Sequence, residues 1–226
     1  MNPVSAHLWL HSERPEPGDA ALLDADERAR AARFVRAEDR ARFVAAHALL
    51  RRALSHGREV PPEAWRFRQD EAGKPWVEGG GPAFSLSHWP GGVAALVADA
   101  GPIGVDGERL GRLSDPLALT RGIFSPEERA VLADPATRER RFLERWCLKE
   151  AWSKAVGGGL ALPVERVAFE VGTGGAVGLS LPDDLGRAAD WTLRLLAPAP
   201  AHLVAVALGG GHPWRLLVHP SAEILP

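Results

Sequence analysis

The amino-acid sequence predicts an α+β protein built from two similar α+β halves. Helices followed by antiparallel strands occur twice along the chain, which favours two units of the same class. The length of 226 residues also suits one large domain or two units of about 110 residues each. We place the halves at 1–103 and 104–226. No repeat is visible at the level of sequence, so the duplication is a hypothesis about architecture.

The first half predicts a strand, a helical region and a β-rich end. AHLWL at 6–10 alternates as a short strand does, and PEPGD after it is a loop. From about Asp24 to His56 apolar residues recur at helical spacings among arginines, which predicts two helices with a break near Glu38 and Asp39. The segment WRFRQDEAGKPWV predicts a hairpin that turns at DEAGK. Further strands are predicted at 84–88, 91–99 and 101–110.

The second half repeats this order. A helical stretch is predicted at 116–133 and a longer helix at 137–156, which GGG at 157–159 ends. Four strands are then predicted, at 164–171, 176–181, 190–198 and 202–209.

Composition excludes several classes of protein. The hydrophobic fraction of 46% and the charged fraction of 25% are those of an ordinary globular protein. A formal net charge of -2 argues against a general nucleic-acid binder, and the longest apolar runs are far shorter than the roughly 20 residues that span a bilayer. The N-terminus does not resemble a secretion signal, and Cys147 alone allows no intramolecular disulfide. We therefore expect a cytoplasmic protein that binds neither nucleic acid nor membrane.

Two acidic residues mark the first candidate site. Asp106 and Glu108 in GVDGERL are two residues apart, so on a strand both carboxylates face the same side. Mg²⁺ is the expected guest of such a pair, because it takes oxygen ligands from one or two carboxylates and from substrate phosphates. The alternative is a solvated strand end that binds nothing.

The stretch WCLKEAWSK, 146–154, supplies the second. Glu150 and Lys154 are four residues apart and share a helix face, with Trp146 one turn back. An exposed ion pair between them would contribute only roughly 0.3–0.5 kcal/mol. That account leaves unexplained why a chain with three lysines, otherwise cationic through arginine, holds two of them here. Lys149 points about 100 degrees away from Glu150 round the helix, so a structural role is expected for it.

These segments resemble a family in their order and spacing. The larger, broad-specificity class of 4'-phosphopantetheinyl transferases shows the motifs G-[IV]-D-x-E, F-[ST]-x-x-E and W-x-x-K-E-[AS]-x-x-K, preceded by G-K-P and F-N-L-S-H. The matching segments here are GVDGE at 104–108, FSPEE at 124–128, WCLKEAWSK at 146–154, AGKP at 72–75 and FSLSH at 84–88. The resemblance covers about residues 30–165. It implies a single-chain pseudodimer with the active site in the cleft between its halves.

The resemblance also implies an activity. The enzyme would transfer the 4'-phosphopantetheine arm of coenzyme A to a serine of an apo acyl or peptidyl carrier protein and release 3',5'-ADP. Asp106, Glu108 and Glu150 would hold Mg²⁺, Glu150 would act as general base directly or through a water, and Lys154 would contact the pyrophosphate. A monomer is expected, with secondary-metabolite biosynthesis as its setting.

For coenzyme A the resemblance names a set of binding residues: Arg42, Lys74, Ser87, His88 and Lys154. Arg42 matches a family arginine at the 3'-phosphate, and the next three match positions that contact phosphates or adenosine. Arg30 and Arg33 are weaker candidates, because their helix is rich in arginines that form a solvated face.

Three positions depart from the family pattern. Gly107 replaces an aliphatic residue between the two carboxylates, and Ser85 and Trp89 replace an asparagine and a serine. Glycine loosens a strand by roughly 0.5–1 kcal/mol, so metal affinity is expected to suffer. Two other functions therefore stay open: a Mg²⁺-dependent nucleotide pyrophosphatase, with water as acceptor, and a carrier-protein or coenzyme A binding module without turnover.

Overall fold

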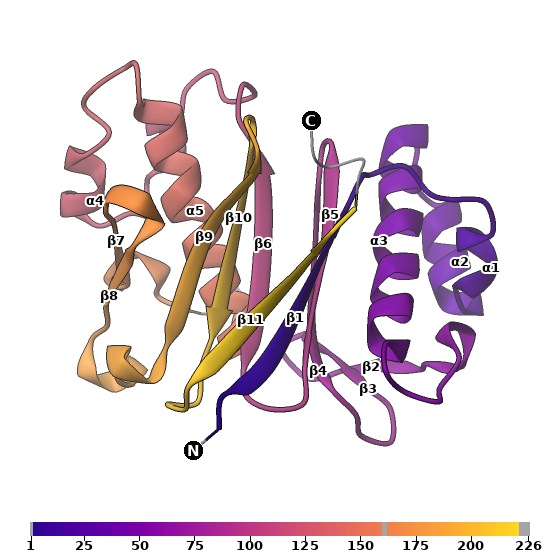
Figure 1. The fold of residues 1–226 in the computed structure, drawn as a ribbon. Coiled ribbons are helices and arrows are strands. Elements are labelled where there is room, and N and C mark those ends of the chain that lie inside the picture. Colours follow the sequence, from indigo (N-terminus) through magenta and orange to yellow (C-terminus); the bar gives the residue numbers. More distant parts are fainter. Residues whose placement is uncertain (1, 160–161, 222–226) are drawn as a thin grey trace.

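The computed structural model describes residues 2–159 and 162–221 and has four layers (Figure 1). Helices cover the outer face of each of two β-sheets, and the two sheets pack face to face at the centre. The predicted α+β class is confirmed. Within the described residues, no helix is both long enough and apolar enough to cross a lipid bilayer.

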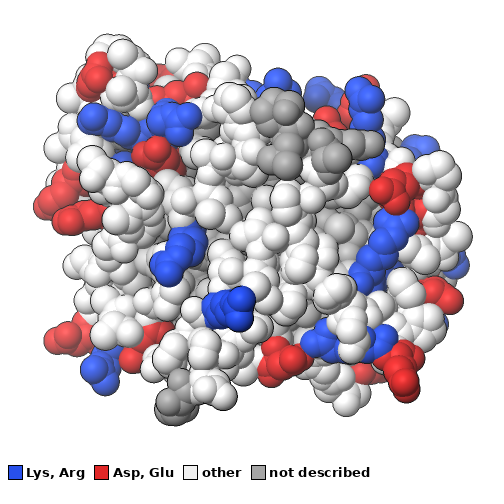
Figure 2. Space-filling view, viewed as in Figure 1, with Lys and Arg blue, Asp and Glu red and all other residues white. Residues whose placement is uncertain are grey.

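The α-helices form the outer layers. They are α1 (Asp19–Leu22), α2 (Ala25–Ala32) and α3 (Ala37–Ser55) on one side, and α4 (Pro126–Ala130) and α5 (Arg138–Val156) on the other. Charged side chains gather over these layers, whereas the face over β9, β11 and β1 carries few of them (Figure 2).

The strands form two main sheets and two small hairpins. The first sheet has the order β11-β1-β5-β4, and the second has the order β6-β10-β9. The first contains β1 (Val4–His11), β4 (Ala83–Trp89), β5 (Gly92–Ala98) and β11 (Trp214–Pro220), and the second contains β6 (Ile103–Arg109), β9 (Thr192–Ala199) and β10 (His202–Leu208). The hairpins pair β2 (Phe67–Gln69) with β3 (Pro75–Val77), and β7 (Ala168–Val171) with β8 (Val177–Ser180).

Three apolar clusters hold the layers together. One packs α3 on the first sheet, one fills the space between the sheets, and one packs α5 on the second sheet. At Gly104 of β6, a Cβ atom would lie 1.9 Å from the carbonyl oxygen of Ala151 in α5. Only glycine allows α5 to approach β6 this closely.

Two serine hydroxyls join the sheets at their facing edges. The backbone N–H of Val105 donates to Ser85 Oγ at 3.1 Å, and that of Gly107 donates to Ser87 Oγ at 3.1 Å. β4 is the last strand of the first sheet and β6 the first of the second. Side-chain oxygens of β4 thus satisfy backbone donors of β6, which would otherwise be buried without partners.

The structure corrects several predicted boundaries. The break between the long helices lies at residues 33–36, because Glu38 and Asp39 instead occupy the first turn of α3, where the helix dipole favours acids. The predicted helix at 116–133 is a 3-10 turn at Leu117–Leu119 followed by the short α4, which Ser125 caps. The strand predicted at 164–171 begins only at Ala168, after a 3-10 turn.

One strand was missed. β11 pairs in parallel with β1, from Val4 opposite Trp214 to Leu10 opposite Pro220. The second-half residues 214–220 therefore complete the sheet of the first half, whereas β6 begins at 103, beside the predicted boundary. The division into halves at 103 and 104 stays a prediction.

Candidate active site

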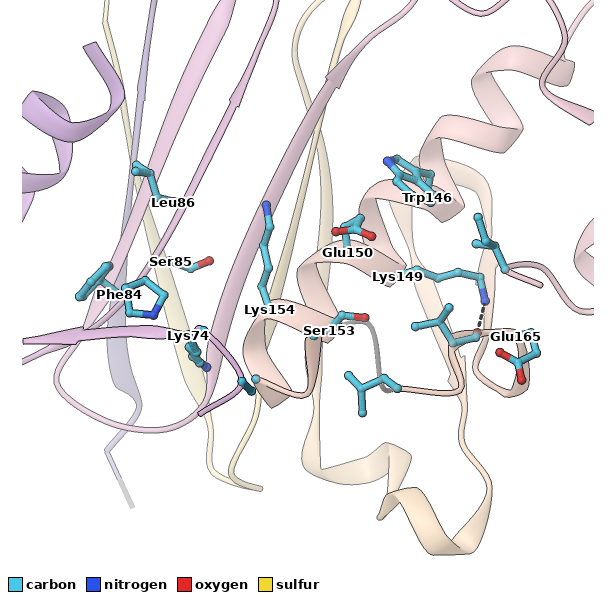
Figure 3. A pocket seen from close by; sticks show the side chains of 18 of the residues that line it. Lys74, Phe84, Ser85, Leu86, Trp146, Lys149, Glu150, Ser153, Lys154 and Glu165 are labelled. Carbon is cyan, nitrogen blue, oxygen red and sulfur yellow. Dashed lines mark hydrogen bonds between the residues drawn. The ribbon is translucent and has the colours of Figure 1, made fainter. Parts of the chain in front are cut away.

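A cavity of about 590 Å³ separates elements of the two halves. Its first-half wall comes from β4 and from the loop and strand around Lys74, and its second-half wall comes from α5 and the segments beside it. Glu150 and Lys154 point from α5 into the space between that helix and β4 (Figure 3). The cavity thus collects the side chains that the motif 146–154 predicted to share a face.

β6 presents its two acidic residues towards α5. Gly104 meets the α5 backbone, and two residues further Asp106 Oδ1 accepts a hydrogen bond from Lys154 Nζ at 2.7 Å. Glu108 follows on the same side of the strand, and burial first, then the negative charge of Asp106, raises the pKa of Glu108. The predicted common orientation of both carboxylates is what the strand shows.

Lys154 is tied to β6 and not to its helix neighbour. Its Nζ also donates to the carbonyl of Val105 at 3.1 Å, and Ser87 Oγ donates to Asp106 Oδ1 at 3.0 Å. No ion pair joins Glu150 to Lys154 within the described residues. The alternative of an exposed helix pair is therefore wrong, since Lys154 instead links α5 to the acidic strand.

Burial and mutual repulsion act on the carboxylates. Burial first, and the charge of Asp106 second, raise the pKa of Glu150 and of Glu108, while Lys154 opposes the increase in both. Within residues 2–159 and 162–221, no group of three or more His, Cys, Asp or Glu side chains is arranged to hold a metal ion. The metal set of Asp106, Glu108 and Glu150 stays a prediction, although its oxygen donors suit Mg²⁺ chemically.

Lys149 has the structural role expected of it. Its Nζ lies 2.9 Å from Glu128 Oε2, donates to the carbonyls of Val164 and Val167, and points away from Lys154 (Figure 3). Burial lowers the pKa of this lysine, and the adjacent Glu128 opposes that change. These carbonyl contacts tie Lys149 to the 3-10 turn Val164–Arg166 that precedes β7.

The motif FSPEE is structural as well. Ser125 caps α4, and Glu128 completes a capping box by accepting from the Ser125 N–H at 3.0 Å. The other oxygen of Glu128 accepts from the N–H of Phe169 at 3.0 Å. Together with Lys149, this carboxylate holds α4, α5 and β7 together beside the cavity.

Four of the residues expected to bind coenzyme A, Arg42, Lys74, Ser87 and Lys154, have hydrogen-bond partners within the protein. Arg42 Nε lies 2.8 Å from Glu13 Oε2, and Lys74 Nζ donates at 2.6 Å to the carbonyl of Ala155 in the last turn of α5. Burial lowers the pKa of Lys74. His88 is exposed, yet dense surrounding protein, followed by the charges of Arg42 and Lys154, lowers its pKa to about 4. Their roles toward coenzyme A stay predictions.

A second cavity of about 560 Å³ adjoins the first in the N-terminal half. Pro75, Phe84 and Leu86 line both cavities, and Arg30 and Arg33 line the second. From the sequence, these arginines were only weaker candidates; both are exposed, and helical periodicity alone does not show that they line a cavity together with residues of the hairpin β2-β3. The apolar cavity walls at Leu86, Ile123 and Trp146 were also missed, since such side chains read as core residues.

Known proteins resemble this chain in sequence. The family model described as the 4'-phosphopantetheinyl transferase superfamily matches residues 102–207, which include β6 and α5. 4'-Phosphopantetheinyl transferase HetI of Nostoc sp. is 33% identical over 90% of this chain and 87% of its own length. A phosphopantetheinyl transferase of Thraustochytrium sp. is 29% identical over 91% and 79%. Sfp of Bacillus subtilis is 29% identical over 72% and 73%.

The fold and the site define a class of protein: an α+β chain in which acidic and basic groups face each other across a cavity. The chain belongs to the 4'-phosphopantetheinyl transferase superfamily, and it is an enzyme of that class.

Proposed function

We propose that this enzyme transfers the 4'-phosphopantetheine arm of coenzyme A to a serine of an apo carrier protein and releases 3',5'-ADP. The observation that carries the proposal is the cavity lined by Glu150 and Lys154 of α5, together with the contact of Lys154 with Asp106 of the adjacent strand β6 at 2.7 Å. Phosphoryl-type transfer depends mainly on positioning and on neutralising phosphate charge. The site offers carboxylates and an ammonium group for these two tasks.

Glu150 is the proposed general base. In the transfer, the serine Oγ forms a bond to the phosphorus that carries the pantetheine arm, the bond from that phosphorus to the oxygen bridging to 3',5'-ADP breaks, and the serine proton passes to Glu150 directly or through a water. A carboxylate whose pKa is raised by burial accepts such a proton more readily at neutral pH. Lys154 is the proposed point charge for the pyrophosphate.

The acidic residues are the proposed Mg²⁺ ligands. Asp106, Glu108 and Glu150 offer oxygen donors, and burial first, with the negative charge of Asp106 second, raises the pKa of Glu108 and Glu150; a divalent cation would relieve the repulsion. Mg²⁺ commonly binds through one or two carboxylates together with substrate phosphates, so coenzyme A itself would complete the site. When bound, the ion would neutralise charge on the pyrophosphate.

The nucleotide end of coenzyme A is proposed to bind to residues of the first half. Arg42, Lys74, Ser87 and His88 are the proposed contacts of the 3'-phosphate, the other phosphates and adenosine. Arg42 and Lys74 would exchange their present carboxylate and carbonyl partners for phosphate oxygens. Arg30 and Arg33 at the adjoining cavity become supporting candidates. A cytoplasmic monomer that serves secondary-metabolite biosynthesis remains the proposal for setting and assembly.

The test is incubation of the protein with coenzyme A, Mg²⁺ and an apo carrier protein, followed by intact-mass measurement of the carrier. A mass gain equal to the phosphopantetheine arm supports the proposal. Release of 3',5'-ADP without a carrier would identify the pyrophosphatase instead, and binding of coenzyme A without turnover would identify the non-catalytic module.

Two variants test the assigned roles. Asp106→Ala is expected to abolish Mg²⁺-dependent transfer, and Lys154→Ala is expected to lower turnover roughly 100-fold or more. The matched control is Arg140→Ala, which removes an exposed cation from an i,i+4 pair of the same helix, 3.7 Å from Glu144. Normal turnover in Asp106→Ala, or equal losses in the two cation variants, would remove these residues from the mechanism.

A further inference from the structure

Two of the departures from the family pattern touch each other. A Cβ atom at Gly107 of β6 would lie 2.3 Å from Cζ3 of the Trp89 indole, far closer than real side chains approach. The indole therefore occupies the space into which a side chain at 107 would project. An aliphatic residue at 107 and tryptophan at 89 exclude each other, so the glycine is required by the tryptophan.

The indole cannot simply move aside. Its opposite edge meets Gly92, where a Cβ would lie 2.5 Å from Cζ2, and its Nε1–H donates to His202 Nδ1 at 3.2 Å. The residue is 1% exposed within the cluster that fills the space between the sheets. Trp89 thus contacts the start of β5, strand β6 and strand β10 at once. A fixed ring of this size sets the separation of those backbones.

This contact lies directly behind the acidic residues. Residue 107 faces the first sheet, while its neighbours Asp106 and Glu108 face α5. The Gly107 N–H is also bonded to Ser87 Oγ, the hydroxyl that donates to Asp106. A larger side chain at position 107, or the loss of its contact with the indole, would therefore move both carboxylates relative to Glu150 and Lys154.

We propose that Trp89 and Gly107 form a compensating pair in which the indole replaces the missing side chain at 107 and holds β6, with Asp106 and Glu108, at its working distance from α5. Trp89 is thus a positioning residue that acts through β6. The part concerning the carboxylates rests on the proposed function, whereas the pairing itself does not.

A double-mutant cycle on unfolding tests the pairing. Gly107→Val is expected to increase the unfolding equilibrium constant roughly tenfold or more in the wild-type background, and less than about threefold in a Trp89→Ala background, where the ring is gone. Trp89→Leu with Gly107→Ala provides a milder cycle should the first set fold poorly. Equal costs of the position-107 change in both backgrounds would overturn the pairing.

Metal titration tests the positioning role. In the presence of coenzyme A, the Mn²⁺ concentration for half-saturation, followed by electron paramagnetic resonance, is expected to rise roughly tenfold in Trp89→Leu and to recover in Trp89→Leu/Gly107→Ala. The matched control is Trp65→Leu, which removes another buried indole whose Nε1–H is bonded, here to Ser55 Oγ at 2.9 Å.

The outcomes separate the two proposals. Equal shifts in the Trp89 and Trp65 variants would reduce Trp89 to a packing residue and overturn its positioning role. A wild-type chain that neither binds Mn²⁺ nor modifies a carrier would overturn the proposed function and the claim on the carboxylates together. The unfolding cycle would then still decide whether residues 89 and 107 act as a pair.

Discussion

The two halves anchor their long helices by the same device with different cations. In the first half, Arg51 of α3 is fully buried against Glu27, the N3 residue of the capping box at the start of α2. In the second half, Lys149 of α5 is buried against Glu128, the N3 residue of the capping box of α4. This correspondence supports the proposed pseudodimer more directly than the repeated order of elements does.

The difference lies in what each cation leaves for its helix to do. Arg51 binds Glu27 at 2.6 Å, Asp24 at 3.0 Å and two backbone carbonyls through its planar guanidinium. Lys149 uses a compact ammonium for one carboxylate and two carbonyls. Lys149 anchors α5 on the side of Glu128, while its neighbour Glu150 faces the cavity. Stability and the candidate site are therefore adjacent on α5.

The largest expected effect comes from removing either of the two buried cations. Arg51→Ala and Lys149→Ala are each expected to lower the free energy of unfolding by about 3–5 kcal/mol, because a buried carboxylate would lose its partner. Urea unfolding midpoints measure the loss. At a temperature where both variants are folded, only Lys149→Ala is expected to reduce transfer per folded molecule. An equal reduction in Arg51→Ala would show that the anchors do not differ in this respect.

Gly104 tests how strictly α5 must approach its sheet. Gly104→Ala is expected to cost about 3 kcal/mol, since the new Cβ would overlap the carbonyl of Ala151 at 1.9 Å and must displace backbone. The control is Gly178→Ala in β8, where a Cβ would make an ordinary contact at 3.4 Å with Glu170. Similar unfolding midpoints for the two variants would contradict the close packing of α5 on β6.

Lys74 of the first half links the two halves through its contact with α5. Lys74→Met keeps most of the stem but loses the hydrogen bond to the Ala155 carbonyl, so the free energy of unfolding should fall by about 1 kcal/mol. If Lys74 also binds coenzyme A, the KM for coenzyme A rises in the same variant. An unchanged KM would leave it only the role of tying the β2-β3 hairpin to α5.

The smallest expected effect is a pH dependence of the first sheet. His7 Nδ1 lies 3.1 Å from His219 Nε2 between β1 and β11, with Trp9 stacked on both rings, His56 tilted against them, and Arg58 and Asp99 near His7. Burial first, and neighbouring histidines second, lower the pKa of both His7 and His219.

The sign follows from proton uptake. Below the ordinary histidine pKa of about 6.5 the unfolded chain binds protons that these folded imidazoles resist, so stability is complete above that pH and declines as pH falls. The free energy of unfolding between pH 7.5 and 5.5 should therefore decrease, and His219→Gln should flatten the decrease. His11→Gln, on the same strand as His7, is the control. A wild-type slope of zero or of opposite sign would refute the account.

Local patterns predicted the elements that carry the site. The alternation of a strand placed Asp106 and Glu108 on one side, and helical spacing placed Glu150 and Lys154 on one face, because both signals lie within a few residues. Contacts between distant segments were beyond reach. No local signal pairs Lys154 with Asp106, joins β11 to β1, or shows that Gly107 is small because Trp89 is large.

The pairing of β11 with β1 bears on how the chain is made. Among the described strands β1 is made first and β11 last, so the edge of β1 that β11 covers has no partner until residues 214–220 have been synthesised. An open strand edge is a template for aggregation. During translation the first half thus exposes an unpaired strand edge until β11 covers it, which gives β11 a protective role in the biogenesis of this polypeptide.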